Sequence, residues 1–363
     1  MNFHIAGLGT AVPRELVTQA DAARLAVELC AVGHGHTATI PALYRRSGVR
    51  KRHSVVLTSS TNGRPAEQSF YPVADDPADR GPTTAERMRR YEVDAVDLAV
   101  RAAQGALDQA CWSAERIAHL VTVSCSGFAA PGVDIGLIER LELPRDVSRT
   151  HVGFMGCHGA LNGLRVAGAL ASSDPGAGVL VCCVELCSLH QQYTDNAQQI
   201  VANALFSDGA AAVAGIADRA GQSVWQIVDQ RSHLLRNTAE LMSWRIGDHG
   251  FEMTLSPRVP DVIHGALRPW LTQWLAEHLL TIDDIRGWAI HPGGPRILTA
   301  CADALGLDAS CLEPSQEVLA DYGNMSSPTV LFILERLRDS AESLPCVVLA
   351  FGPGLTIEAA LLG

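Results

Sequence analysis

The sequence is poor in charged residues and carries no excess of positive charge. Only 18% of its 363 residues are charged, against 47% that are hydrophobic, a balance typical of a well-folded globular protein with a substantial core. The formal net charge is −11. Such a chain lacks the basic surface that binding to DNA or RNA requires, although a local basic patch can still bind a phosphorylated small molecule. We therefore expect a small-molecule partner and no nucleic acid.

Long hydrophobic runs are also absent. No apolar run reaches the roughly 18 to 20 residues needed to cross a bilayer. The opening stretch, MNFHIAGLGTAVP, has no basic region of the kind that begins a signal peptide. We expect a cytoplasmic protein without a membrane span.

The cysteines form no CxxC pair and have no regular spacing, so the sequence gives no indication of a disulfide scaffold. For the same reason we expect no metal site. There are ten of them, at positions 30, 111, 125, 157, 182, 183, 187, 301, 311 and 346. Most lie in apolar stretches. Because a free cysteine behaves as a small hydrophobic residue, we expect buried, reduced thiols.

Continuous apolar runs predict the strands of the fold. The runs at 119–126, 178–186 and 345–352 show no polar alternation, which is typical of strands covered on both faces by helices. A long helix is predicted over 83–112, opened by a capping box in which Thr83 and Glu86 satisfy free amides. The proline-rich segment 59–82 predicts an irregular surface excursion.

Strands alternate with helices in both parts of the chain, which predicts a layered α/β/α architecture. The stretch 215–229 is the best boundary, and we divide the chain into 1–218 and 219–363. The segments AAAVAGIA (210–217) and TIEAALL (356–362) look like the closing strands of two similar halves.

Cys157 lies in HVGFMGCHGALNG (151–163), between glycines and just before an apolar pattern with helical spacing. This places the sulfur at or near a helix N-terminus, where free amides and the helix dipole lower the pKa of a thiol. The alternative from this segment alone is a tightly packed helix start with a filler cysteine. The neighbouring His158 is interpreted as structural, because adjacent helical residues point about 100° apart.

Two further segments present polar side chains on glycine-bounded turns. His291 ends an apolar strand and precedes Pro-Gly-Gly, and Asn324 follows Gly323 immediately before a helix. Each has an ordinary explanation alone, and helix capping is the commonest role of such an asparagine. Together with Cys157 they supply a thiol, an imidazole and an amide where open α/β sheets place their sites. Acyl-thioester chemistry needs such a set, a thiolate to take the acyl group and neutral donors to hold a developing oxyanion or enolate.

Five segments carry a family resemblance: GFMGCHGALNGLR, ALFSDGAAA, HPGGPRIL, YGNMSSPTVLFIL and AFGPGLTIE. They resemble, in order and across nearly the whole chain, the signatures of type III polyketide synthases, the chalcone synthase-like branch of the thiolase superfamily. The resemblance implies a thiolase-like fold in which two similar halves form an α/β/α/β/α architecture. It also implies a homodimer, CoA thioester substrates without a bound cofactor, and iterative decarboxylative condensation of malonyl-CoA onto a starter acyl group.

The resemblance assigns roles to individual residues. Cys157 matches the acyl-accepting nucleophile, and His291 and Asn324 match the pair that polarises the malonyl thioester carbonyl. Phe206 matches the aromatic gatekeeper between CoA tunnel and cavity. A protonated His291 beside the thiol would also favour the thiolate of Cys157.

The chain departs from plant chalcone synthases around this core. Met253 stands where the plant gate has a second phenylalanine, Trp244 replaces a small cavity residue, and Cys125 falls where bacterial members often carry a cavity cysteine. The other expected pocket residues are Cys187, His190 and Ser326, and the alternative for all of these positions is ordinary core packing. The departures favour a bacterial-type starter, either malonyl or an alkyl acyl group, and cyclisation to a resorcinol, phloroglucinol, naphthalene or pyrone.

The densest basic patch is RRSGVRKRH, 45–53, where family members meet the CoA phosphates. The alternative interpretation of this patch is a solvent-exposed helix end without a ligand. The expected CoA-binding residues are Arg45, Arg46, Arg50, Lys51 and Arg52.

Other functions remain open on sequence. A ketoacyl-ACP synthase III-like enzyme uses the same three residue types, but HPGGP and AFGPG favour the polyketide interpretation. A biosynthetic thiolase needs a second catalytic cysteine near the C-terminus, and Cys346 lies within a predicted strand. The usual signatures of a cysteine hydrolase are absent. A non-catalytic acyl-CoA-binding protein would not need all three catalytic residue types.

Overall fold

Strands from both halves of the chain form one hydrogen-bonded sheet, in the order β13-β14-β15-β10-β1-β9-β8-β6-β7. The computed structural model describes residues 3–30, 39–58, 67–217, 225–338 and 343–363. The first half contributes β1 (Phe3–Ala11), β6 (Ile117–Ser124), β7 (Ser148–Gly153), β8 (Gly178–Leu186) and β9 (Asp208–Ile216). The second contributes β10 (Trp225–Leu234), β13 (Gly287–Ile290), β14 (Cys346–Gly352) and β15 (Thr356–Leu362). The halves join where Phe3, His4 and Ile5 of β1 pair antiparallel with β10.

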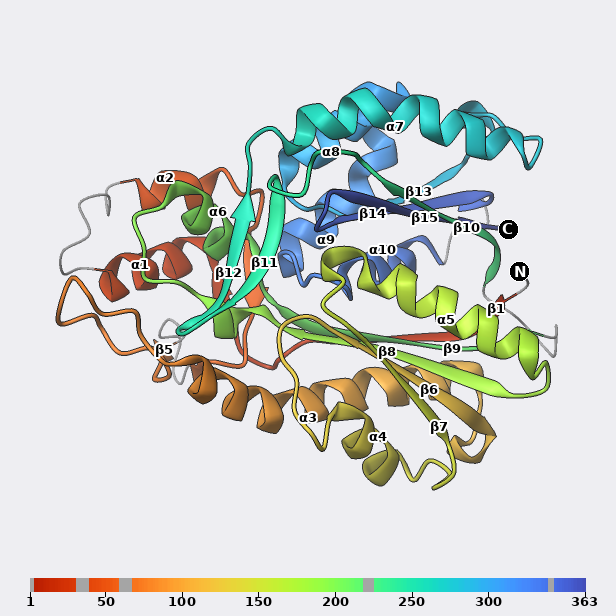
Figure 1. Cartoon of the computed structure of the whole chain (residues 1–363), viewed down its shortest axis with the longest axis horizontal. Helices are drawn as coiled ribbons and strands as arrows, with labels where there is room; N and C mark the ends of the chain where they lie inside the picture. Colours follow the sequence, from red (N-terminus) through yellow and green to blue (C-terminus); the bar gives the residue numbers. More distant parts are fainter. Residues whose placement is uncertain (1–2, 31–38, 59–66, 218–224, 339–342) are drawn as a thin grey trace.

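Helices cover both outer faces of this strand system and fill the space between its two halves (Figure 1). α3 (Thr84–Ala110) and α4 (Val133–Leu141) cover the first half, and α7 (Val259–Ala276) and α8 (Pro295–Leu305) cover the second. α5 (Gly159–Ser173) and α10 (Thr329–Leu337) lie between them. The expected α/β/α/β/α layering of a thiolase-like fold is confirmed.

Side-chain alternation along the buried strands explains how one strand serves two cores. In β8, Val179, Val181 and Cys183 face the central core, whereas Leu180, Cys182 and Val184 face α3. β14 alternates in the same way between the central core and the core under α7 and α8. Because strand side chains point to opposite faces in turn, a continuous apolar run is what a strand between two helix layers requires.

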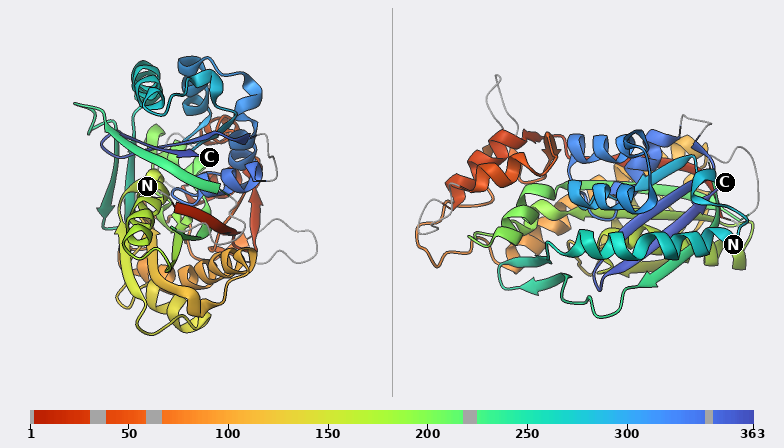
Figure 2. Two further views of the ribbon diagram at one scale, coloured as in Figure 1. Left: turned by 90° about the vertical axis from the view of Figure 1, so that its right-hand side faces the viewer. Right: turned by 90° about the horizontal axis from the view of Figure 1, so that it is seen from above.

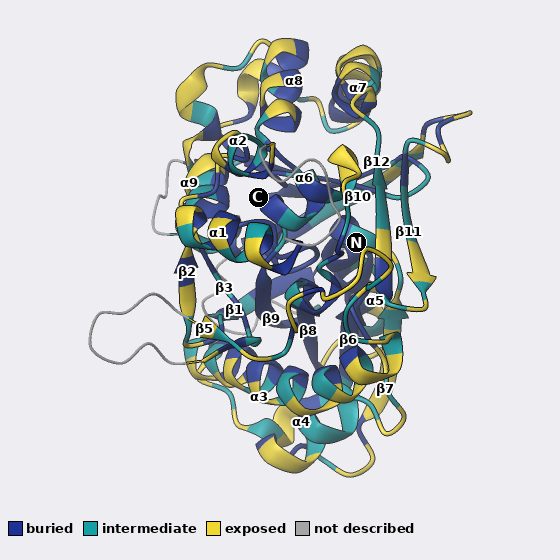
Figure 3. Ribbon diagram, turned by 90° about the vertical axis from the view of Figure 1, so that its left-hand side faces the viewer, coloured by how far each residue is buried: buried dark blue, intermediate teal, exposed yellow. Residues whose placement is uncertain are grey.

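The expected long helix is α3, and its capping box is present. The Glu86 amide donates to Thr83 Oγ1 at 3.3 Å, and the Thr83 amide donates back to the Glu86 carboxylate at 2.7 Å. Buried α3 side chains such as Tyr91, Ala95 and Leu98 recur every three or four residues, and the opposite face is exposed (Figure 3).

The smaller elements gather beyond one end of the sheet, where α1 and α2 extend outward (Figure 2). They are α1 (Gln19–Leu29), α2 (Ile40–Arg45), α6 (Ala197–Leu205), β2 (Leu16–Thr18), β3 (Lys51–His53), β4 (Leu57–Thr58) and β5 (Glu67–Gln68). α9 (Glu313–Tyr322) precedes α10, and the hairpin of β11 (Met242–Gly247) and β12 (Gly250–Leu255) follows β10 and packs against α6 of the first half.

The described residues bear on several further expectations. All ten cysteines are free and eight are buried, whereas Cys111 is exposed and Cys311 is half-buried. In the proline-rich segment, residues 67–82 are irregular apart from β5 and mostly exposed, as expected, and residues 59–66 lie outside the described part. The proposed boundary at 218 and 219 also lies outside the described part.

No helix within the described ranges is both long and apolar enough to cross a bilayer. The same ranges contain no group of His, Cys, Asp and Glu that could hold a metal ion.

Candidate active site

Cys157 lies on a tight turn between β7 and α5. A short 3-10 helix, Gly156–His158, precedes α5 directly. The turn needs Gly156, because its φ is +71° and a Cβ there would lie 2.5 Å from the Pro353 ring. Cys157 is therefore held where the first half of the chain meets the loop that follows β14.

His291 comes directly after β13, and its position is fixed through the backbone. Its amide donates to the Leu349 oxygen of β14 at 2.8 Å. The side chain is buried, and neither ring nitrogen has a hydrogen-bond partner. Two unpaired ring nitrogens in a dry environment are costly, so an imidazole left in this state is available to a ligand.

Asn324 is fixed by three hydrogen bonds. Its amide donates to the Leu205 oxygen at 2.8 Å, its carbonyl accepts from the Ser207 amide at 2.9 Å, and its Oδ1 accepts from the Ser326 amide at 2.8 Å. With Oδ1 engaged, the side chain presents its NH₂ group as the donor. The amide therefore has one defined orientation next to Cys157.

The three residues line one cavity with an empty volume of about 350 Å³. Its other walls are Phe206, Met242, Met253, Leu255, Gly293, Ile297 and Phe351. Thus a thiol from the first half and an imidazole and an amide from the second meet in a mainly apolar space.

Burial determines the protonation states of these groups. The pKa of Cys157 is raised to about 11, mainly by burial and also by the Glu185 carboxyl, against the opposing effect of hydrogen bonds from Ser326 and Asn324. Burial, followed by the charge of nearby His158, lowers the pKa of His291 to about 3. The resting site therefore contains a neutral thiol and a neutral imidazole. The expectations of a lowered thiol pKa and of a protonated His291 were wrong, because loss of solvation outweighs the helix start.

A second cavity, with an empty volume of about 340 Å³, also borders Cys157. Its walls are Cys125, Gly156, Cys187, Phe206, Met242, Trp244, Met253, Ser326 and Pro353. Six of the seven side chains expected around the nucleophile therefore lie there. We call the two spaces around Cys157 the reaction cavity.

His190 is the exception, and its ring is fully engaged in the protein. Its Nε2 lies 2.6 Å from the Ser126 oxygen, and its Nδ1 accepts from the Phe251 amide at 3.0 Å. The ring stacks on Phe251 with centroids 4.1 Å apart. Burial lowers the pKa of His190 to about 3, so it is a neutral packing residue that holds β12 in place.

The hairpin of β11 and β12 supplies one wall of the reaction cavity. Met242 pairs with Leu255, and Trp244 pairs with Met253, so all four share one face, while Arg245 and Glu252 on the other face are exposed. The hairpin tip is tied to the start of α3 by Thr84, which accepts from the Gly250 amide at 2.8 Å. This wall is thus anchored at its far end.

Glu185 is a residue of the site that sequence reasoning missed. It lies fully buried near the end of β8 and accepts hydrogen bonds from the hydroxyls of Ser126 and Ser327, both at 2.6 Å, and from the Cys125 amide at 2.9 Å. The Cys125 sulfur lies 3.2 Å from both Glu185 Oε1 and Ser326 Oγ. Burial raises the pKa of Glu185. Its only signal was a lone carboxylate in the apolar run GVLVCCVEL.

A larger surface cavity, with an empty volume of about 1210 Å³, adjoins the reaction cavity. The two share Leu255, Gly293 and Ile297 as walls. Arg46 and Arg296 line it, and both are exposed. Arg46 was expected from the basic patch, whereas Arg296, within HPGGPRIL, was missed.

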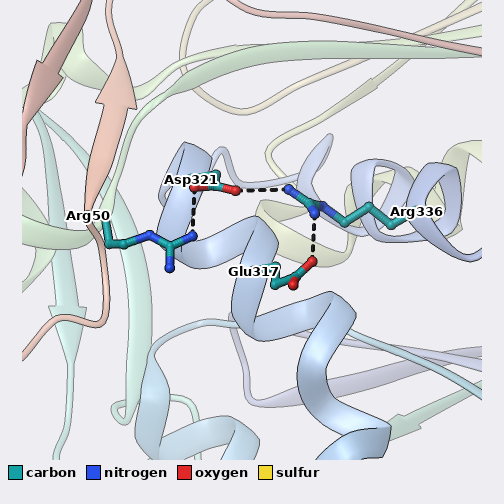
Figure 4. A network of polar contacts seen from close by, with 4 residues as sticks. All are labelled: Arg50, Glu317, Asp321 and Arg336. Atoms are coloured by element: carbon teal, nitrogen blue, oxygen red, sulfur yellow. Dashed lines mark hydrogen bonds and ion pairs between the residues drawn. The ribbon is translucent and has the colours of Figure 1, made fainter.

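The rest of the basic patch is divided by the fold. Arg45 ends α2 and Lys51 lies on β3, both exposed and outside the walls of this cavity. Arg50 pairs with Asp321, which also pairs with Arg336, and Arg336 contacts Glu317 (Figure 4). Arg50 is thus engaged in a surface ion-pair network.

Arg52 corrects the expected CoA-binding set. It is buried, and its guanidinium donates to the backbone oxygens of Asn203 at 2.6 Å and Phe206 at 2.9 Å. It also lies over the Tyr44 ring. A guanidinium used in this way supports the gate region and cannot meet a phosphate at the surface.

Enzymes that move acyl groups between thioesters need a nucleophile for the acyl group and neutral donors for an enolate. The two halves of this fold bring both kinds of group to one cavity. This arrangement has the features of a thiolase-like acyltransferase.

Comparison with known proteins gives the family. Residues 2–218 match the N-terminal domain of chalcone and stilbene synthases, and residues 226–363 match the C-terminal domain. The chain therefore belongs to this family and is a type III polyketide synthase, as its five segments indicated. Members of the family use acyl-CoA substrates.

The chain is 35% identical over 365 residues to the alpha-pyrone synthesis polyketide synthase-like Pks18 of Mycobacterium tuberculosis, covering 98% of this chain and 90% of that protein. It is 36% identical over 364 residues to the 1,3,6,8-tetrahydroxynaphthalene synthase of Streptomyces peucetius subsp. caesius, covering 99% and 92%. The crystal structure of PKS-I from the brown alga Ectocarpus siliculosus superposes with a TM-score of 0.90 at 31% identity, covering 99% and 97%. These matches give no support to a ketoacyl-ACP synthase or to a non-catalytic binding protein.

Proposed function

We propose that Cys157 is the nucleophile, and that His291 and Asn324 are the donors that promote loss of CO₂ from malonyl-CoA. The Cys157 sulfur attacks the thioester of the starter, an acyl–sulfur bond forms, and its proton ends on the departing CoA thiol. In this proposal the half formed by residues 1–218 supplies the nucleophile, and the half formed by residues 219–363 supplies the donors.

Extension then follows in the same cavity. The neutral imidazole of His291 and the NH₂ group of Asn324 donate to the carbonyl oxygen of malonyl-CoA. The bond to CO₂ breaks, and its electron pair passes to the enolate, which both donors stabilise. The enolate carbon attacks the acyl carbon on Cys157 and releases the thiolate, which takes up a proton. The chain has grown by two carbons and is carried by CoA.

The observation that carries this proposal is the buried His291 ring, whose two nitrogens have no protein partner although Cys157 and Asn324 line the same cavity. Because a neutral imidazole can donate without first gaining a proton, the low pKa suits this role.

The test separates loading of the enzyme from loss of CO₂. Purified protein is given malonyl-CoA with a panel of acyl-CoAs, and acyl-enzyme, CO₂ and products are measured by mass spectrometry. In His291→Ala and Asn324→Ala, we expect decarboxylation to fall about a hundredfold or more and loading to fall much less. Cys157→Ala should lose all product but still decarboxylate malonyl-CoA. Equal loss of both steps in the His291 and Asn324 variants would contradict the assigned roles.

We further propose that substrates reach Cys157 through the cavity lined by Arg46 and Arg296, that no cofactor is bound besides the CoA thioesters, and that the product is a resorcinol, phloroglucinol, naphthalene or pyrone. The names of the two bacterial relatives support a pyrone or a naphthalene. Mass spectra of the product with each starter distinguish these outcomes.

A homodimer is also proposed. β7 is an edge strand with mostly exposed side chains. Two large apolar side chains are also exposed, Phe128 on the loop between β6 and α4 at 45% and Met155 on the turn after β7 at 37%. Edge strands with apolar neighbours are commonly covered by another chain. Light scattering of the purified protein tests this proposal, and a monomer at micromolar concentration would contradict it.

A further inference from the structure

The surface around the cavity lined by Arg46 and Arg296 is positively charged, in a chain that is acidic as a whole. All wall residues of this cavity come from four short segments: 43–47, 197–205, 255–260 and 293–297. These segments contain four arginines and no aspartate or glutamate, although acidic residues outnumber Lys and Arg by 39 to 28 in the chain. The other two arginines are Arg45 and Arg258. We call the four arginines the arginine rim.

The side chains of the arginine rim are not used by the protein itself. All four are exposed, and none has a hydrogen bond or an ion pair to another side chain or backbone group of the described residues. The neighbouring Arg50, by contrast, is paired with Asp321. Cations without counter-charges around a concave opening create a positive potential that attracts an anionic partner.

Only two members of the arginine rim can meet a ligand inside the cavity. Arg46 and Arg296 are wall residues. Arg45, the last residue of α2, and Arg258, which immediately precedes α7, lie between wall residues but do not line the cavity. Their charges are therefore available to a partner that is larger than the cavity and rests on the surface around its mouth.

We propose that the arginine rim is the docking surface for an acyl carrier protein with an acidic surface, which delivers the starter on its phosphopantetheine arm. The inference rests on the proposed nucleophilic role of Cys157. Because CoA and carrier proteins share the pantetheine arm, one cavity accepts both. The Cys157 sulfur attacks the thioester carbonyl, an acyl–sulfur bond forms, the bond to the arm sulfur breaks, and the proton of Cys157 ends on the arm thiol.

The surface favours an acidic protein over an anionic membrane. None of the large apolar side chains that are exposed in the described part of the chain comes from the four wall segments. A protein that lies on a membrane buries apolar side chains in the lipid. An acidic carrier protein needs only complementary charge around an opening that admits its arm.

The test compares three donors of a hexanoyl group to Cys157: hexanoyl-pantetheine, hexanoyl-CoA and a bacterial fatty-acid acyl carrier protein charged with hexanoate. Acyl-enzyme formation is followed by intact-protein mass spectrometry. We expect the carrier protein to react about tenfold faster than hexanoyl-pantetheine, and added salt to reduce this advantage. Arg45→Ala and Arg258→Ala should each slow transfer from the carrier protein about threefold, and about tenfold together, and leave transfer from hexanoyl-CoA unchanged.

Arg286→Ala is the matched control. Arg286 is exposed and immediately precedes β13, so it lies at the opposite end of this strand from His291. Its replacement should change none of the three rates. The proposal is overturned if the carrier protein reacts no faster than hexanoyl-pantetheine, or if Arg45→Ala and Arg258→Ala slow its reaction no more than Arg286→Ala does.

The outcomes also separate this inference from the proposed function. Loading of Cys157 by hexanoyl-CoA but not by the carrier protein would overturn the docking surface and leave the nucleophile in place. Binding of the carrier protein that Arg45→Ala and Arg258→Ala weaken, without acyl transfer from any donor, would support the docking surface and contradict the role of Cys157. Binding to phosphatidylglycerol vesicles, with no binding of the carrier protein, would overturn the proposal in favour of a membrane surface.

Discussion

The indole N–H of Trp244 donates to the backbone oxygen of Cys125 at 2.7 Å. This bond fixes the ring between the reaction cavity and a further space that is lined by α1 and β4, since Trp244 is a wall of both. Trp244 therefore separates the two spaces and limits the reaction cavity on this side.

Replacing this ring tests that limit. Trp244→Ala removes the shared wall, so we expect products lengthened by one or more two-carbon units, measured by mass spectrometry. Trp244→Phe is the control, because it keeps most of the bulk and loses only a hydrogen bond worth about 1 kcal/mol. Unchanged product lengths in Trp244→Ala would show that the ring does not limit the cavity.

The pH dependence of thiol reactivity follows from the pKa of about 11 for Cys157. Below that value the thiolate fraction increases about tenfold for each pH unit, so the rate of alkylation of Cys157 by iodoacetamide should rise steadily between about pH 6 and pH 10. The pKa of His291, at about 3, predicts no inflection near its ordinary value in the decarboxylation rate of Cys157→Ala. A plateau of the alkylation rate beginning near pH 7 would indicate an imidazolium–thiolate pair instead.

The sequence was a good guide to the parts of this molecule that are local. The capping box of α3, the buried strands and the turns that present Cys157, His291 and Asn324 all depend on residues near one another in the chain. The protonation states were not predictable in this way, because they depend on burial by both halves. The same holds for Arg52. In the sequence it is one more cation of a basic patch, whereas in the structure it is buried and donates a hydrogen bond to the backbone oxygen of Phe206.

Glu185 is the clearest residue that only tertiary structure reveals, and it gives a stability prediction. Glu185→Ala leaves the hydroxyls of Ser126 and Ser327 and the amide of Cys125 without their acceptor. At about 1–3 kcal/mol for each buried unpaired group, we expect a loss of roughly 3 kcal/mol or more in the free energy of unfolding. Urea denaturation measures it.

Glu185→Gln is the matched variant, because it keeps the volume and one carbonyl oxygen. We expect a clearly smaller loss of stability than in Glu185→Ala. Equal losses in the two variants would mean that the network around Glu185 contributes by volume and not by hydrogen bonding.

The entry cavity gives a prediction about substrate binding. Arg46→Ala and Arg296→Ala each remove a cation that faces the proposed path of CoA, so we expect KM for malonyl-CoA to rise about fivefold with kcat little changed. Added salt should raise KM in the unmodified protein and have less effect in the variants. Arg45→Ala removes a neighbouring charge outside the cavity walls and provides the comparison. An equal rise of KM in Arg45→Ala would indicate that only the overall positive charge of this surface matters, and not the position of Arg46 and Arg296.

The identity of the acylated residue tests the account most directly, because three thiols, Cys125, Cys157 and Cys187, line the reaction cavity. The protein is incubated with hexanoyl-CoA, digested and mapped by tandem mass spectrometry. We predict one acyl group, on Cys157, that persists in Cys125→Ala and Cys187→Ala and disappears in Cys157→Ala. Acylation of Cys125 or Cys187 in the unmodified protein, or acylation that survives in Cys157→Ala, would contradict the assignment of Cys157 as the nucleophile.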